Sequence, residues 1–259
     1  MKIVLEILLF ILLIIGLSCT KLENKSNKSP GQEILLTASQ HFSSIGKTDR
    51  TLTIFKDSTF NFTETIVEPN YDKIESFKGK TRINNDTIKF LPFKLKHNNA
   101  EIAVLKNGFI EFIDSNRPDR MKIKETALTV KNNIDFRNFQ DYAVFTLNKN
   151  SEPQSNEQDY KSYDLTTSEL TKIETILKQT FEKNKILRDF SDYIKQVESV
   201  ENKNKQHLIF IQCYCKSFLT NESYQYYQIE MSDGGNCNIY IVLNLTTERI
   251  EVLNIAGDA

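Results

Sequence analysis

The chain has 259 residues, which is enough for two domains that each bury their own core. Its 33 Lys and Arg residues nearly balance 34 Asp and Glu residues, for a formal net charge of -1. This balance argues against a nucleic acid partner and against broad adsorption to acidic lipid, so any membrane contact must come from the N-terminus.

The N-terminus has the pattern of an export signal. Lys2 supplies a positive charge, residues 3–15 form an apolar run interrupted by Glu6, and Ser18 precedes Cys19. The run is shorter than the roughly 20 residues that a helix needs to cross a bilayer, which favours a signal peptide over a permanent span.

This segment resembles the precursors of bacterial lipoproteins. The resemblance implies removal of a signal peptide at 1–18, with cleavage between Ser18 and Cys19, and acylation of Cys19, for example with palmitate. Two or three acyl chains, at about 0.8 kcal/mol per buried CH₂, then hold the chain on a membrane of the cell envelope, facing the periplasm or the cell exterior. An uncleaved N-terminal anchor is the alternative. Residues 19–33 are predicted to be the lipidated cysteine and a polar tether.

Residues 34–147 are predicted to form an antiparallel β-meander. Alternating segments separated by turn residues indicate hairpins at 51–63, 82–90 and 103–112, the last around Asn107-Gly108. With further strands at 76–82 and 121–124, seven or eight strands would form a small barrel or a strongly twisted sheet. The residues expected to face its interior are Phe60, Phe62, Ile88, Phe90, Ile110 and Phe112.

The hairpin rhythm and the phrase Leu-Thr-Ile-Phe-Lys-Asp-Ser-Thr-Phe at 52–60 resemble the small lipocalin-like domains of bacterial lipoproteins. Lipocalins carry a Gly-x-Trp near the first strand, whereas this chain has no Trp. We therefore expect a core filled by side chains, and a small apolar ligand bound inside the β domain is the alternative.

Residues 148–159 are entirely polar and are predicted to be a linker to an α+β domain at 160–259. Thr166 and Glu169 form a capping box, followed by an apolar helical face at Leu170, Ile173, Leu177 and Phe181. The spacing of Phe190, Tyr193, Ile194 and Val197 predicts a second, shorter helix. Apolar segments at 207–218, 237–245 and 249–255 predict an antiparallel sheet packed on the helix.

The segments 209–215, 233–237 and 253–259 resemble the C-terminal domain of uncharacterised bacterial lipoproteins. The resemblance covers roughly the last 100 residues. It implies a cystatin-like or similar α+β sheet and no known activity.

The cysteines predict one disulfide. With Cys19 lipidated, Cys213, Cys215 and Cys237 remain, an odd number in an oxidising compartment. Cys213 and Cys215 are two apart on a strand and share a face, so either can meet Cys237 if the strands are neighbours. We favour a disulfide between Cys215 and Cys237; pairing of Cys213 with Cys237, or buried free thiols, are the alternatives. No paired histidines complete a metal site, and His207 lies on the same predicted strand as Cys213.

No catalytic or cofactor motif stands out. His41 and His97 occur singly in polar segments and are expected to be solvated. The sequence therefore predicts a non-catalytic binding or envelope-associated lipoprotein, without cofactor or metal, whose partners are the membrane and another envelope protein. A peptidase inhibitor of cystatin-like fold is the alternative, although Gln212–Lys216 lacks the Val and Gly of an inhibitory hairpin. A hydrolase has no motif to support it.

Overall fold

The computed structural model describes residues 32–43, 46–91, 97–148, 160–219 and 222–257. The predicted signal peptide, the predicted lipidation site at Cys19 with Ser18 before it, and the predicted linker at 148–159, except for Asn148, lie outside the described residues. The described residues from Glu33 onwards form one compact unit.

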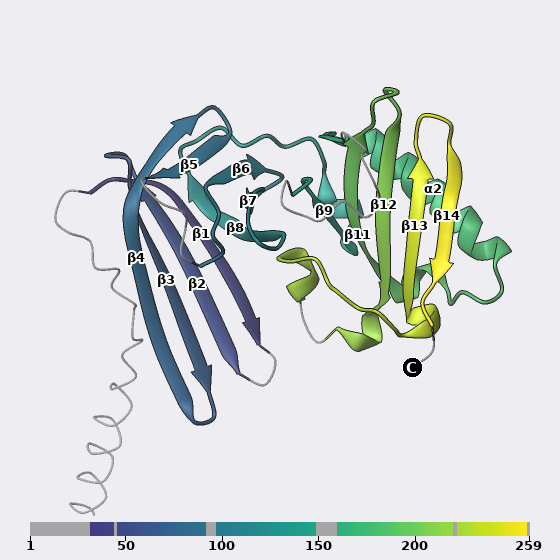
Figure 1. Ribbon diagram of the computed structural model, residues 1–259, viewed down its shortest axis with the longest axis horizontal. Helices are drawn as coiled ribbons and strands as arrows, with labels where there is room; N and C mark the ends of the chain where they lie inside the picture. Colours follow the sequence, from purple (N-terminus) through teal and green to yellow (C-terminus); the bar gives the residue numbers. More distant parts are fainter. Residues whose placement is uncertain (1–31, 44–45, 92–96, 149–159, 220–221, 258–259) are drawn as a thin grey trace, which may run out of the picture. The chain divides into compact units, whose positions relative to one another are not determined.

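Eight antiparallel strands form a closed barrel in which each strand pairs with the next and β8 pairs with β1 (Figure 1). The predicted barrel is therefore confirmed. Its strands are β1 (Ile34–Ser43), β2 (Lys47–Phe55), β3 (Thr59–Glu68), β4 (Tyr71–Asn84), β5 (Thr87–Leu91), β6 (Ile102–Lys106), β7 (Phe109–Phe112) and β8 (Asp119–Thr126).

Residues in the left-handed conformation form the turns of two hairpins. Asn85 (φ 53°) joins β4 to β5, and Asn107 (φ 51°) with Gly108 (φ 80°) joins β6 to β7, all in the left-handed conformation that these residue types tolerate best. The residues expected to face the interior are buried, and they contact one another: the rings of Phe60 and Phe90 are 5.2 Å apart between centroids. This half of the barrel is a core filled by side chains.

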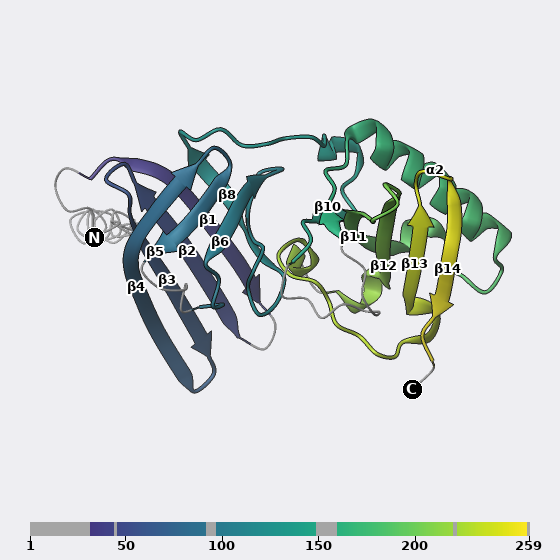
Figure 2. The same ribbon diagram turned by 45° about the horizontal axis from the view of Figure 1, so that its top comes forward.

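The strands of the barrel differ in length, and this shapes its other end. β4 pairs with β3 from residue 71 to residue 80 but with β5 only from residue 80 onwards, and β1 pairs with β8 only at residues 36–39. The outer parts of β1 to β4 therefore extend past the four shorter strands (Figures 1 and 2). We call residues 40–43, 47–51, 63–68 and 71–79 the four-stranded extension.

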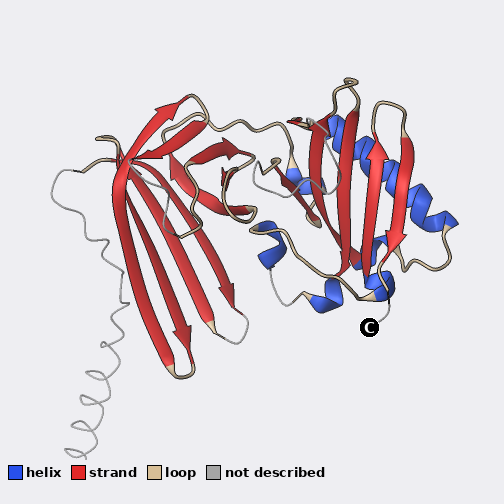
Figure 3. Cartoon of the chain, in the orientation of Figure 1, coloured by secondary structure: helices blue, strands red, loops and turns tan. Residues whose placement is uncertain are grey.

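The second half of the chain forms another sheet with one long helix against it, α2 (Thr167–Lys183) (Figure 3). The sheet order is β10-β11-β12-β13-β14, with β9 beside β11. The strands are β9 (Tyr142–Phe145), β10 (Lys161–Ser162), β11 (Tyr193–Glu201), β12 (His207–Cys215), β13 (Asn238–Asn244) and β14 (Arg249–Ile255). The predicted helix with a second sheet is confirmed, and so is the capping box of Thr166 and Glu169.

Two features of this sheet differ from expectation. β9 lies in the segment expected to belong to the first domain, but it pairs in parallel with β11. The predicted helix near Phe190–Val197 is wrong: a short 3-10 turn, Phe190–Asp192, leads into strand β11. Tyr193 and Val197 pack under α2 while Ile194 packs on the opposite face. A strand buried on both faces carries apolar side chains on each of them, so a helical spacing of apolar residues can arise there by coincidence.

Candidate functional site

A layer of polar side chains lies on the inner surface of the barrel, next to the apolar core. The register places Gln40 opposite Arg50, and Arg50 opposite Glu64. Each is two residues from a fully buried apolar side chain, such as Leu52 or Phe62, and side chains two apart on a strand share a face. Strands β1, β2 and β3 therefore direct these three polar side chains inward.

A continuous hydrogen-bonded network joins this layer to β8. Arg50 Nε donates to Glu64 Oε1 at 2.6 Å, and Arg50 Nη1 donates to Gln40 Oε1 at 2.8 Å. Gln40 Nε2 in turn donates to Asp119 Oδ1 at 3.0 Å. Asn98 Nδ2 also donates to Asp119, at 3.4 Å. Ionised partners and short distances make these charge-assisted bonds stronger than neutral ones.

His97 belongs to the same network, which contradicts the expectation that it is solvated. Its side chain is only 9% exposed, with Nε2 2.8 Å from Asp119 Oδ2 and Nδ1 3.7 Å from Glu64 Oε1. Its ring stacks on Phe62 at 5.0 Å. His41, by contrast, is exposed and pairs with Asp49. We call Gln40, Arg50, Glu64, His97, Asn98 and Asp119 the barrel polar cluster.

Charged groups continue from this cluster along the inner face of the four-stranded extension. Arg50 and Glu64 are 18% and 12% exposed, whereas Lys73 and Glu75, paired at 2.7 Å, are 42% and 31% exposed. Cations and anions therefore follow one another from the barrel interior out to the solvent. In the described part of the chain, the charged side chains next to His97 are the carboxylates of Asp119 and Glu64, so the cluster has ion-pairing chemistry.

Cys215 and Cys237 form a disulfide, with their Cα atoms 4.8 Å apart. It joins the end of β12 to the start of β13 and so closes the loop between them. Cys213 is a buried free thiol whose pKa burial raises to about 12, which is unfavourable for a nucleophile. His207 lies at the opposite end of β12 and stacks on Tyr163 at 3.6 Å.

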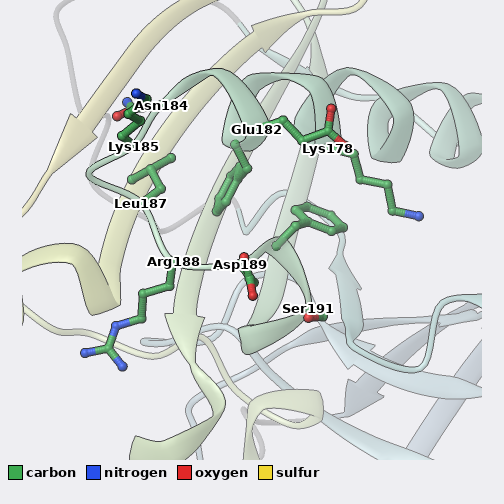
Figure 4. Close-up of a pocket in the computed structure, with 10 residues that line it drawn as sticks. Lys178, Glu182, Asn184, Lys185, Leu187, Arg188, Asp189 and Ser191 are labelled. Carbon is green, nitrogen blue, oxygen red and sulfur yellow. The ribbon is translucent and has the colours of Figure 1, made fainter.

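Another candidate region lies where α2 ends. A pocket of about 480 Å³ is lined by Lys178, Phe181, Glu182, Asn184, Lys185, Leu187, Arg188, Asp189, Phe190 and Ser191 (Figure 4). In Figure 4 the side chains of Lys178 and Arg188 point to different sides, and each has a partner: Glu174 at 3.4 Å and Asn236 at 3.2 Å. One short segment makes the whole pocket, and its charges do not converge.

Buried ionisable groups flank the second sheet. Lys195 lies against Phe190, with Nζ 3.8 Å from the ring centroid, and burial lowers the pKa of its amino group to about 8. On the opposite face of β11, burial raises the pKa of Glu198 to about 7, and Gln228 Nε2 donates to its carboxyl group at 2.9 Å.

The position of Gln212 does not support the alternative of a peptidase inhibitor. Gln212 lies inside β12, between β11 and β13, and not at the tip of a hairpin. Within the described ranges, no group of three or more His, Cys, Asp or Glu side chains is arranged to hold a metal ion. The helices described here include none with the length and apolar character needed to span a membrane.

Sequence reasoning missed the barrel polar cluster because its members come from three strands, a loop and β8, and only the register brings them together. One signal was present: Gln40, Arg50 and Glu64 each continue the inward phase of an apolar alternation. No known family model, curated protein or solved structure is significantly similar to this chain.

Proposed function

We propose that this protein is a non-catalytic binding lipoprotein of the cell envelope. Lipid on Cys19, exposed by cleavage after Ser18, anchors it, and the inner face of the four-stranded extension binds a small zwitterionic ligand. The N-terminal sequence supports the anchor, and the barrel polar cluster supports the binding role.

The observation that carries the binding role is the placement of both signs of charge inside a barrel. Burying a charge costs free energy unless it is paired, and an apolar layer of similar volume is often more stable. The layer next to the cluster, which contains Ala38, Leu52 and Phe62, is of that apolar kind. The charged side chains in the next layer outwards, where apolar side chains would often be more stable, therefore support a role in binding a ligand.

The geometry favours a ligand that has both an ammonium and a carboxylate group. Lys73 and Arg50 are cations that suit a carboxylate, and Glu75 and Glu64 are anions that suit an ammonium group. An amino acid or a short peptide has this chemistry. A small apolar ligand is less well supported, because Phe60, Phe90 and Phe112 pack on one another.

We assign the barrel to a lipocalin-like architecture and the second sheet to a cystatin-like or similar one. The peptidase inhibitor is less well supported than the binding protein. An inhibitory hairpin must be exposed to enter a protease, whereas residues 212–215 form part of a central strand. Another envelope protein as a partner remains compatible with this proposal.

Calorimetric titration of the intact protein with a panel of amino acids and dipeptides tests the binding role. At least one member is expected to bind, and Lys73→Ala is expected to weaken that binding at least tenfold. Lys80→Ala is the matched control, because Lys80 lies on the same strand and points outward. A panel without any binder, or equal binding by Lys73→Ala, would overturn the proposal.

A further inference from the structure

Four exposed cations lie together on the outer face of the barrel. Lys78, Lys80 and Arg82 alternate along β4 with inward-facing residues, and Lys89 of β5 lies opposite Arg82. Side chains two apart on a strand share a face, so all four point outward, and all four are exposed. We call these four residues the outer basic surface.

The chain does not neutralise this surface with its own carboxylates. Among the described residues, none of the four cations has an ion pair with Asp or Glu. Their neighbours on the adjoining strands are neutral: Thr59 and Asn61 of β3 and Ile102 of β6. Asp57 and Asp86, in the adjoining turns, each accept a hydrogen bond from a neighbouring threonine. The surface therefore keeps its positive charge.

The charges on this surface repel one another. Arg82 and Lys89 are directly opposite on neighbouring strands, and like charges in such a pair destabilise a sheet. Both side chains point away from the barrel core, so packing inside the barrel does not require them. An anionic partner outside the chain would offset the repulsion. The formal net charge of -1 conceals this surface, because a net charge does not show how charges are distributed.

The outer basic surface lies at the end of the barrel where the compact unit begins. The backbone N–H of Lys56 donates to the carbonyl oxygen of Glu33 at 2.9 Å, and the backbone N–H of Thr81 donates to that of Ser58 at 2.7 Å. The turn at 56–58 therefore contacts both the first residues of the barrel and the part of β4 that carries the outer basic surface (Figure 1).

We infer that the outer basic surface lies against the acidic phospholipid headgroups of the membrane that holds the chain. This inference rests on the proposed anchor at Cys19. Cys19 is 14 residues before Glu33, a span of at most about 50 Å, so lipid on Cys19 brings this end of the barrel to the membrane. Lys and Arg side chains are attracted to acidic headgroups within a screening length of about 8 Å at physiological ionic strength.

Contact with the membrane leaves the proposed ligand site uncovered. Lys73 and Glu75 lie on β4 in the inward phase, whereas the outer basic surface lies in the outward phase. One face of β4 therefore serves the ligand and the other serves the membrane.

Amine labelling of the chain made in a bacterial host, purified and added to preformed vesicles, tests this inference. A water-soluble acetylating reagent, read by peptide mass spectrometry, is expected to modify Lys78, Lys80 and Lys89 about fivefold more slowly on phosphatidylglycerol vesicles than on phosphatidylcholine vesicles. High salt should remove the difference, because it screens the attraction. Lys183 and Lys203, which are exposed in the second half of the chain, are the controls and should react equally on both.

Charge reversal tests the surface itself. The double variant Lys80→Glu, Arg82→Glu should restore the reactivity of Lys89 on phosphatidylglycerol vesicles, and the matched variant Lys183→Glu, Lys203→Glu should leave Lys89 protected. Equal labelling on the two kinds of vesicle, protection that survives charge reversal, or protection by an acidic polysaccharide but not by vesicles would overturn the inference.

The anchor and the surface fail in different ways. If Cys19 carries no palmitate and Lys89 is still protected on acidic vesicles, the anchor is wrong and the membrane surface stands. If Cys19 carries palmitate and Lys89 reacts equally on both kinds of vesicle, the inference is wrong and the anchor stands.

Discussion

Burial sets the protonation of two side chains three residues apart on β11. It lowers the pKa of Lys195 to about 8 and raises the pKa of Glu198 to about 7, in each case because the charged form loses its solvation. The two side chains lie on opposite faces of the strand. A change of pH across neutrality therefore alters the charge on both sides of the sheet.

Glu198 makes stability depend on pH. Its folded pKa of about 7 lies above the ordinary value of 4.5, so the folded chain holds the proton more tightly. This contribution is complete below pH 4.5 and is lost as the pH rises to about 7. We expect the free energy of unfolding to fall by about 1–3 kcal/mol between pH 5 and pH 8, and Glu198→Gln to remove most of this fall.

Urea unfolding at the two pH values measures the effect. Gln at position 198 keeps a hydrogen-bonding partner for Gln228, so the variant is expected to fold. Glu201→Gln is the control, because the pKa of Glu201 is lowered by its hydrogen bond with Lys205. An unchanged pH dependence in Glu198→Gln would contradict the assignment.

At the scale of elements, the sequence predicts those features that depend on residues close together in the chain. The hairpin turns depend on Asn and Gly within a few residues, and the start of α2 depends on Thr166 and Glu169. Register and strand partners depend on residues far apart in the sequence. Tyr142 of β9 pairs with Lys195 of β11, 53 residues away, and Gln40 meets Asp119 only because β1 pairs with β8. Local sequence patterns alone therefore could not predict the barrel polar cluster.

The helix cap offers a direct test at this scale. Thr166 accepts from the backbone N–H of Glu169, and Glu169 accepts from the backbone N–H of Thr166. Thr166→Ala is expected to lower the free energy of unfolding by about 1 kcal/mol. Thr175→Ala, an exposed substitution inside α2, should be neutral or slightly stabilising, because Ala has the higher helix propensity. Equal losses in the two variants, by urea unfolding, would contradict a capping role.

At the scale of the whole molecule, Arg120 of β8 connects segments from the length of the chain. Its guanidinium lies between the rings of Phe109 and Phe145, 4.0 Å and 4.2 Å from their centroids. Nη1 donates to Glu111 Oε1 at 3.1 Å and to the carbonyl oxygen of Val144 at 2.6 Å, and Nε donates to the carbonyl oxygen of Gln225. One buried side chain thus contacts the barrel, β9 and the disulfide-closed loop.

Removal of Arg120 should therefore be costly. Arg120→Met leaves Glu111 buried without its cation, and breaking such a pair costs about 3–5 kcal/mol. Arg137→Met is the matched control, because Arg137 is 88% exposed in its pair with Asp135, and we expect a loss below about 0.5 kcal/mol. Thermal unfolding by calorimetry compares the two. Equal stability of both variants would show that Arg120 does not hold these segments together.

The proposed lipid anchor on Cys19 would determine where the whole molecule acts, and palmitate labelling in a bacterial host tests it most directly. The wild-type chain should incorporate radiolabelled palmitate and fractionate with membranes, and Cys19→Ala should do neither. Cys213→Ala should behave as wild type, because Cys213 is buried in the second sheet. Label retained by Cys19→Ala, or a mature chain that still begins at Met1, would contradict the account.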